Sequence, residues 1–235
     1  MKTKTVESTP YEDKQSFDRY IKPEPITEHH KRYHNMLKDK QKKIVVCDGY
    51  AGTGKTIAAM YYACQMVLNK EAKGIVLVKN MEDLEGFLKG SLEEKMMPKA
   101  IQLLKYAECF LQQDYYSLLE DRKIILQPMS YIQGMDWTDY VMIVDECQLI
   151  DAKRMYSICT RGAVKLIING DCSPAQCTAT KVKEGKDGLS FLIKTMDKSK
   201  MFGVVSMDKE EDIVRADYIK DIIINMTEEL EKWYK

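Results

Sequence analysis

The sequence has no excess charge of either sign. Its 235 residues include 36 Lys and Arg and 36 Asp and Glu, so the formal net charge is zero. This balance gives no global field that would attract nucleic acid or an anionic membrane, so binding to either must use a local patch. An apolar run of membrane-spanning length is also missing, and no apolar run follows the polar residues 1–5. We therefore expect a cytoplasmic protein with no signal peptide and no membrane partner.

Cysteine pairs at C-x-x-C spacing are absent from the sequence, and arginines are few. The 7 cysteines include no C-x-x-C pair, which indicates reduced thiols. Cys172 and Cys177 have no partners at zinc spacing. Most basic residues are lysines, and the few arginines are notable because arginine is preferred for bidentate phosphate contacts. The arginines are Arg19, Arg32, Arg122, Arg154, Arg161 and Arg215.

One stretch carries a specific motif. Residues 49–56 fit G-x-x-x-x-G-K-[ST], the pattern of a phosphate-binding loop, and they lie between a short β-branched run and a run of good helix formers. The residues of the loop are Gly49, Tyr50, Ala51, Gly52, Thr53, Gly54, Lys55 and Thr56. Glycines let the backbone wrap round an anion, and the N–H groups of the loop and of the following helix then face the phosphates. The motif predicts that Lys55 reaches the β- and γ-phosphates of ATP and that the Thr56 hydroxyl binds Mg²⁺.

A second block supplies the acids that such a site needs. The hydrophobic run from Tyr140 ends in Asp145 and Glu146. We expect Asp145 to hold the hydrated Mg²⁺ and Glu146 to act as the general base on the attacking water. An apolar run before Asp-Glu is weak evidence alone and gains its weight from the phosphate loop.

Strand-like apolar runs alternate with helical segments along the chain. The expected strands are 44–47, 74–79, 123–127, 140–146, 164–171 and 202–207. The alternation predicts an α/β fold of three layers with a mostly parallel sheet. Ligands of such sheets bind at the carboxyl ends of the strands, which places Gly49, Lys79, Asp145 and Asp171 along one rim. We expect a polar N-terminal arm over 1–25 and one domain over 26–235.

Two expected helices flank this pattern, 26–43 before the first strand and 212–233 at the end of the chain. The first carries His30 and His34 four residues apart, on one face. A contact to the nucleotide base, a zinc site without a clear third ligand and a plain structural role all remain open for these histidines.

Four further residues have a functional and an ordinary interpretation. Gln148 either contacts the γ-phosphate or lies at the surface. Asp171, after a buried strand, either senses the phosphate or caps a helix. Arg161 and Arg215, at expected helix ends, are either surface residues or donors to the γ-phosphate, where an arginine accelerates hydrolysis. We expect at least one of them, with Arg215 as the first choice, to act across a subunit interface.

Together, these blocks resemble the PhoH-like family of P-loop ATPases, whose core is similar to superfamily 1 helicases. The matching segments are 49–56, 86–95, 144–148, 159–161, 170–171 and 212–215. The segment 86–95, Gly-Phe-Leu-Lys-Gly-Ser-Leu-Glu-Glu-Lys, is the most specific, because ordinary P-loop proteins lack it. The resemblance implies a RecA-like core that binds and hydrolyses ATP with Mg²⁺, a homo-oligomeric ring such as a hexamer, and RNA or single-stranded DNA as partner.

The chain departs from the family at several positions. Lys79 stands where the family usually has an arginine, and Gln133 and Met135 stand in a loop that is usually basic. The glutamine expected ahead of the first strand is replaced by His30 or a neighbour. Three functions remain open: an ATPase coupled to nucleic acid, an ATP-dependent switch or assembly protein with a protein partner, and a small-molecule kinase. The loss of positive charge at Gln133 and Met135 favours the switch, and the lack of clustered arginines speaks against the kinase.

Overall fold

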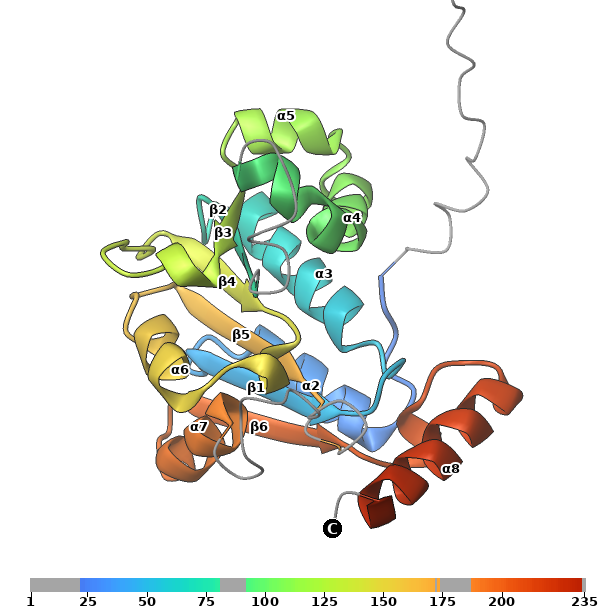
Figure 1. The fold of residues 1–235 in the computed structure, drawn as a ribbon. Helices are drawn as coiled ribbons and strands as arrows, with labels where there is room; N and C mark the ends of the chain where they lie inside the picture. The colour runs from blue at the N-terminus through green and yellow to red at the C-terminus, as the bar shows by residue number, and fades with distance from the viewer. Residues whose placement is uncertain (1–21, 81–91, 172, 174–186, 234–235) are drawn as a thin grey trace, which may run out of the picture.

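A parallel sheet forms the centre of the computed structural model, which describes residues 22–80, 92–171, 173 and 187–233. Its strands follow the order β3-β2-β4-β5-β1-β6, and every pairing is parallel (Figure 1). The strands are β1 (Ile44–Gly49), β2 (Gly74–Lys79), β3 (Ile124–Pro128), β4 (Tyr140–Val144), β5 (Lys165–Gly170) and β6 (Phe202–Met207). The predicted mostly parallel sheet is confirmed.

Helices cover both faces of the sheet. The α-helices are α2 (Glu28–Lys38), α3 (Lys55–Leu68), α4 (Leu92–Leu111), α5 (Tyr115–Glu120), α6 (Ala152–Cys159), α7 (Gly188–Met196) and α8 (Asp217–Trp233). Short 3-10 turns are η2 (Met129–Tyr131), η3 (Cys147–Leu149) and η4 (Glu210–Asp212). Among the α-helices, α5 was not anticipated from the sequence.

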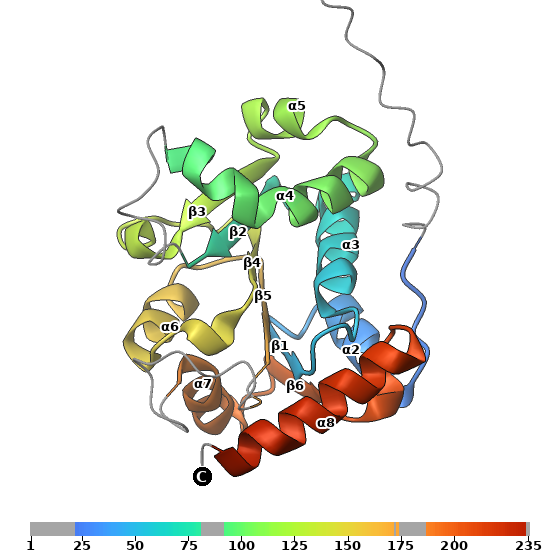
Figure 2. The same ribbon diagram turned by 45° about the vertical axis from the view of Figure 1, so that its right-hand side comes forward.

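Alternate residues of each strand enter two separate hydrophobic cores. In β1, Val45 and Cys47 pack with α2 and α3, whereas Val46 faces the core that contains α6 and α7. Because successive side chains of a strand point to opposite faces, this alternation requires a helical layer on each side. Helices α2, α3, α4 and α5 form one layer, and α6 and α7 form the other (Figure 2). The three-layer prediction is confirmed.

The first helix is shorter than predicted at both ends. It begins at Glu28 because Thr27 caps it: the Thr27 hydroxyl accepts from His30 N, and the His30 ring accepts from Thr27 N. It ends at Lys38 because Asp39 takes an extended conformation.

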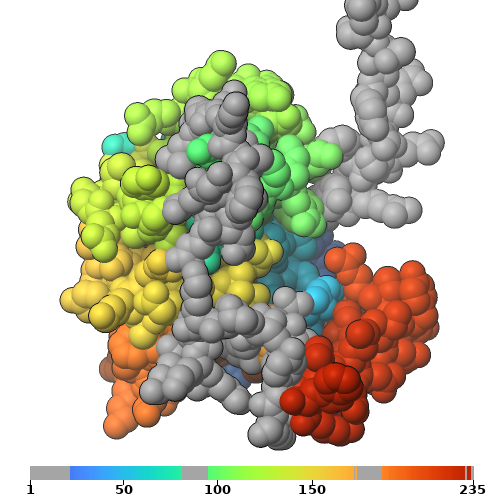
Figure 3. All heavy atoms as spheres, in the orientation of Figure 1, coloured from blue at the N-terminus to red at the C-terminus, as the bar shows by residue number. Residues whose placement is uncertain are grey.

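The last helix begins at Asp217, five residues later than expected. The preceding residues are held by other contacts, since Ile213 is buried and Val214 N donates to Gly52 O at 2.9 Å. In the space-filling view the C-terminal residues form a lobe at the side of the body (Figure 3). No helix in the described part of the chain is long and apolar enough to cross a membrane.

Several expectations fall on residues outside this description. They are most of the N-terminal arm, the segment 86–91 of the most specific family block, Cys172 and Cys177, and most of the loop expected over 178–188.

Candidate nucleotide site

The predicted phosphate loop links the end of β1 to the start of α3. Gly52 has φ 80° and Gly54 has φ 76°, in the left-handed region that favours glycine. Gly54 also stands at the N-cap of α3, whose N-terminus therefore opens on the loop. A Cβ on Gly49 would lie 2.4 Å from Met207 O, so no larger residue fits between the loop and β6. These conformations produce the concave backbone that an anion requires.

Lys55 is folded back into this loop. Its ammonium donates to Gly49 O at 2.6 Å, to Tyr50 O at 2.7 Å and to Thr53 Oγ1 at 3.2 Å. An ammonium has three protons to donate, and here all of its acceptors belong to the loop. Phosphate oxygens entering the loop are stronger, charged acceptors, so the residue stands where it could exchange these neutral partners for a phosphate.

The metal-binding pair predicted from two distant blocks meets at the rim. Thr56 Oγ1 donates to Asp145 Oδ1 at 3.2 Å, although the two residues are 89 positions apart. One strand, β5, lies between β1 and β4, so Asp145 at the end of β4 reaches across it toward the start of α3. A hydroxyl beside a carboxylate is an oxygen donor set that suits Mg²⁺ together with waters and phosphates.

Lys79 completes the surroundings of Asp145. Its ammonium donates to Asp145 Oδ2 at 3.0 Å, and the two side chains are only 6% and 12% exposed. The expectation that Lys79 and Asp145 lie along the same edge of the sheet is met, but the sequence did not reveal this ion pair. The available signal was a lone lysine ending an otherwise apolar strand. With one oxygen on Thr56 and the other on Lys79, the Asp145 carboxylate is fixed in orientation.

Glu146 follows Asp145 in an unusual conformation. Its φ is 58°, in the left-handed region, although it is not a glycine. Such a conformation costs about 1–3 kcal/mol and persists where the surroundings enforce it. Asp145 is largely buried while Glu146 is exposed, so the turn separates two adjacent carboxylates into different environments.

Gln148 and Asp171 join the neighbouring ends of β4 and β5. Gln148 is buried, which makes the surface interpretation wrong, and its Oε1 accepts from Asp171 N at 3.2 Å. Asp171 is buried too, and its Oδ1 accepts from Ser173 N at 3.0 Å. Asp171 thus holds a local turn. The predicted phosphate contacts of both residues stay predictions.

The two arginines lie at opposite ends of the strands. Arg215 packs on the phosphate loop of its own chain, since a Cβ on Gly52 would lie 2.8 Å from Arg215 Cγ and 2.9 Å from its Nε. Arg161 follows α6, and Arg161 O accepts from Trp137 N, just before β4. Its guanidinium donates to Ser157 O and Thr160 Oγ1.

The position of Arg161 follows from the topology. A crossover helix runs antiparallel to the strands it connects, so its C-terminus returns to their amino ends. Arg161 therefore lies across the sheet from its own phosphate loop, and the structure does not bring it into the same site as Lys55.

Comparison with known proteins decides the family. The family model described as "PhoH-like protein" matches residues 21–227. The chain belongs to the PhoH-like family. It is 29% identical over 194 residues to Protein PhoH of Escherichia coli, covering 78% of this chain and 52% of that protein. It is 32% identical over 169 residues to a PhoH-like protein of Bacillus subtilis, covering 65% and 53%. The chain therefore spans about half the length of these relatives.

Solved structures support the fold. The large terminase of a thermophilic bacteriophage superposes with a TM-score of 0.52 at 13% identity, covering 86% of this chain and 50% of that one. The same terminase in complex with ADP gives a TM-score of 0.51 at 14% identity, covering the same shares. This PhoH-like chain thus has the fold of P-loop NTPases.

Next to the loop, Thr27, His29 and Asp212 form a hydrogen-bonded cluster that the sequence did not reveal. Asp212, fully buried, accepts from Thr27 Oγ1 at 2.5 Å and pairs with His29 Nδ1 at 2.7 Å. Burial alone would raise the pKa of Asp212, but the hydrogen bonds from Thr27 and His29 outweigh it and lower that pKa. This cluster connects the start of α2 to the segment that carries Arg215.

The two histidines His30 and His34 make different contacts. His30 Nε2 lies 3.0 Å from Thr53 O of the loop, and His34 Nδ1 lies 3.3 Å from the hydroxyl of Tyr62. In the described residues, no group of three or more His, Cys, Asp or Glu side chains could hold a metal ion. His30 therefore supports the phosphate loop, and its predicted contact to the base stays a prediction.

Proposed function

We propose that this PhoH-like chain binds ATP with Mg²⁺ and hydrolyses it. The observation that carries the proposal is the convergence of the phosphate loop with the acidic pair, marked by the 3.2 Å contact of Thr56 with Asp145. A glycine loop alone binds many anions. A loop beside the Thr56–Asp145 pair, with the exposed carboxylate of Glu146 next to it, has the groups that phosphoryl transfer needs.

Each residue has a defined task in this mechanism. Lys55 and the backbone N–H groups of the loop hold the β- and γ-phosphates in place. Thr56 and Asp145 would hold Mg²⁺, which when bound neutralises charge on the phosphate oxygens. Lys79 keeps the Asp145 carboxylate oriented. Glu146, exposed to solvent, accepts the proton of the attacking water.

We further propose that hydrolysis is coupled to RNA or single-stranded DNA, as the resemblance implies. The alternative, an ATP-dependent switch with a protein partner, has one specific observation in its favour. Residues 133–136, just after η2, are exposed and include Gln133, Met135 and Asp136 but no basic residue. Met135 is 46% exposed, and Tyr131 at the end of η2 is 59% exposed. A surface with exposed Tyr and Met side chains, an acidic residue and no positive charge fits a protein partner better than a phosphate backbone.

A homo-oligomeric ring such as a hexamer is also part of the proposal. The position of Arg215 on its own phosphate loop supports action on the γ-phosphate within one chain. Arg161, at the opposite end of the strands, reaches a γ-phosphate only if a neighbouring subunit presents its site there.

Two measurements test the proposed function. Calorimetric titration with Mg·ATP should show binding to the wild type and none to Lys55→Ala, because the loop loses its cation on the phosphates. Equal affinity of both proteins would remove the phosphate-loop assignment. Phosphate release is then measured with and without single-stranded RNA and DNA. Stimulation supports nucleic-acid coupling, and an unchanged rate with both favours the protein switch.

A further inference from the structure

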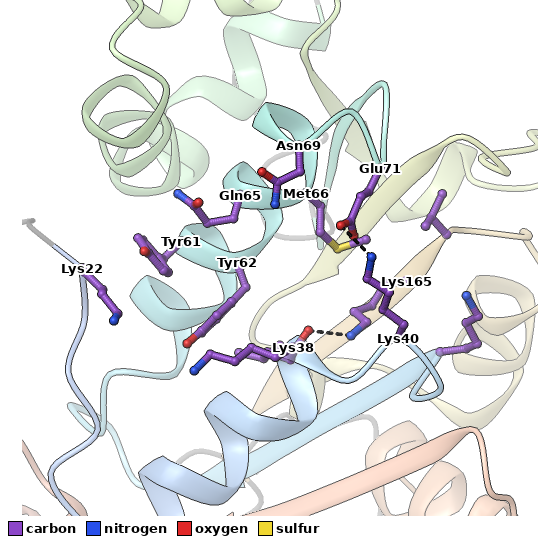
Figure 4. A pocket seen from close by; sticks show the side chains of 13 residues that line it. Lys22, Lys38, Lys40, Tyr61, Tyr62, Gln65, Met66, Asn69, Glu71 and Lys165 are labelled. Atoms are coloured by element: carbon purple, nitrogen blue, oxygen red, sulfur yellow. Dashed lines mark hydrogen bonds and ion pairs between the residues drawn. The ribbon is translucent and has the colours of Figure 1, made fainter.

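A second concave site lies at the opposite end of the strands from the phosphate loop. It is a pocket of about 530 Å³ between the end of α2, the second half of α3 and the start of β5 (Figure 4). Lys43, just before β1, and Lys165, the first residue of β5, both line it. The pocket thus lies at the amino ends of the strands, separate from the nucleotide site. Its volume is in the range of small-ligand pockets, about 300–1,000 Å³.

The lining of this lysine pocket is strongly basic in a chain with no net charge. Its lysines are Lys22, Lys38, Lys40, Lys43 and Lys165, and its acidic member is Glu71. Glu71 pairs with Lys40 at 2.9 Å. Within the described residues, the ammonium groups of Lys22 and Lys43 have no ion-pair or hydrogen-bond partner. The local excess of positive charge is what an anionic ligand requires.

Lys165 forms the floor of the lysine pocket. Its buried ammonium donates to Leu37 O at 2.6 Å, Asp39 O at 2.9 Å and Met36 O at 3.3 Å, at the C-terminal end of α2. Burial lowers the pKa of Lys165 to about 8, although the nearby Asp39 acts to raise it. The pKa of His34 is lowered to about 4, first by burial and then by the charges of His30, Lys38 and Lys22. The charges of Lys38 and Lys22 thus act on His34 next to the pocket, although burial is the larger cause of its lowered pKa.

Helix α3 adds a flat and hydrogen-bonding wall. Tyr61 and Gln65, four residues apart, share one face of the helix, and Asn69, the C-cap residue that follows α3, also lines the pocket. The neighbouring Tyr62 ring is held by Lys38, 5.7 Å from its centroid, and by an edge contact to His34. In the described chain, the side-chain amides of Gln65 and Asn69 have no hydrogen-bond partner. Tyr62 is buried, so the partly exposed Tyr61 is the aromatic side chain of this wall that a base can stack against, and Asn or Gln amides pair with the edge of adenine.

From this combination we propose that the lysine pocket binds a nucleotide unit, with its phosphate on Lys38 and Lys43 and its base against the α3 wall. Such a unit is either a free mononucleotide or one residue of a single strand. The site does not depend on the proposed ATPase, since it shares no residue with the phosphate loop.

The test is calorimetric titration with AMP, with a ten-residue single-stranded oligoadenylate, and with ribose 5-phosphate. The proteins are the wild type, Lys55→Ala, the double variant Lys38→Glu/Lys43→Glu, and Lys105→Glu. Lys38 and Lys43 are exposed, and the exposed Lys105 on α4 is the matched control outside the pocket.

We expect AMP or the oligoadenylate to bind the wild type, Lys55→Ala and Lys105→Glu with the same affinity, and to bind the double variant about tenfold or more weakly. Tighter binding of AMP identifies a free nucleotide, and tighter binding of the oligoadenylate identifies a strand. The proposal is overturned if neither ligand binds, if the double variant binds normally, or if Lys55→Ala alone abolishes binding. Ribose 5-phosphate binding as tightly as AMP overturns it too, because the base would then make no contribution. Loss of ATP hydrolysis does not enter these readouts.

Discussion

Replacing Lys79 by methionine should destabilise the protein much more than a typical lysine substitution. The Lys79–Asp145 ion pair is 3.0 Å long with side chains 6% and 12% exposed. Methionine keeps the apolar stem and removes the charge, which leaves the Asp145 carboxylate buried without its cation. Removing one partner of a buried ion pair costs about 3–5 kcal/mol.

A matched surface pair sets the reference. Lys73 and Asp139 also form an ion pair, but their side chains are 69% and 56% exposed. Surface pairs contribute about 0–1 kcal/mol, so Lys73→Met should change the free energy of unfolding by no more than that. Lys79→Arg keeps a positive charge and should lose less than Lys79→Met.

The assay is urea unfolding of the wild type and the three variants, with and without Mg·ADP. Mg²⁺ bound beside Asp145 replaces the missing positive charge, so the destabilisation of Lys79→Met should shrink when Mg·ADP is present. A loss of less than about 1 kcal/mol, equal to that of Lys73→Met, would refute the buried ion pair. A loss that Mg·ADP leaves unchanged would refute the metal-binding role of Asp145.

Two further predictions concern pH and the arginine at the loop. Burial lowers the pKa of His34 from 6.5 to about 4, so the unfolded chain takes up a proton at a higher pH than the folded chain. The free energy of unfolding should therefore fall by about 3 kcal/mol as pH drops from 6.5 to about 4. Urea unfolding of His34→Gln at the same pH values should lack this dependence. An equal pH dependence in both proteins would contradict the lowered pKa of His34. Arg215→Ala should slow hydrolysis with ATP binding retained. Mixed with Glu146→Gln subunits it should regain no activity, because Arg215 contacts its own loop; recovery in mixed assemblies would show that the arginine acts between subunits.

Local patterns were enough to predict the strands and the core of the nucleotide site. The glycine spacing of the phosphate loop fixes its conformation, and the run ending at Asp145 and Glu146 needs a strand that stops at the rim. The alternation of strands and helices then requires one parallel sheet. Each of these features is encoded by a short run of neighbouring residues, so the pattern predicts it, although the contact between Thr56 and Asp145 joins runs 89 positions apart.

Contacts between distant segments could not be predicted in this way. The partner of Lys79 is 66 residues away and depends on β2 lying next to β4. The hydroxyl of Tyr33 donates to Asn169 Oδ1 at 2.7 Å across 136 residues, a contact that no periodicity indicates. Arg215 was expected at a helix start because its surroundings look helical. Tertiary contacts with Gly52 hold that segment in another conformation.

Hydrolysis of ATP by Glu146→Gln tests the central claim most directly. The substitution preserves the shape of the side chain and removes the base, while Lys55, Thr56 and Asp145 remain in place. The account predicts that the variant binds Mg·ATP with wild-type affinity in a calorimetric titration, but releases phosphate at least about 100-fold more slowly in a single-turnover assay. Wild-type turnover by Glu146→Gln, with wild-type binding, would contradict it, since the water would then need another activator.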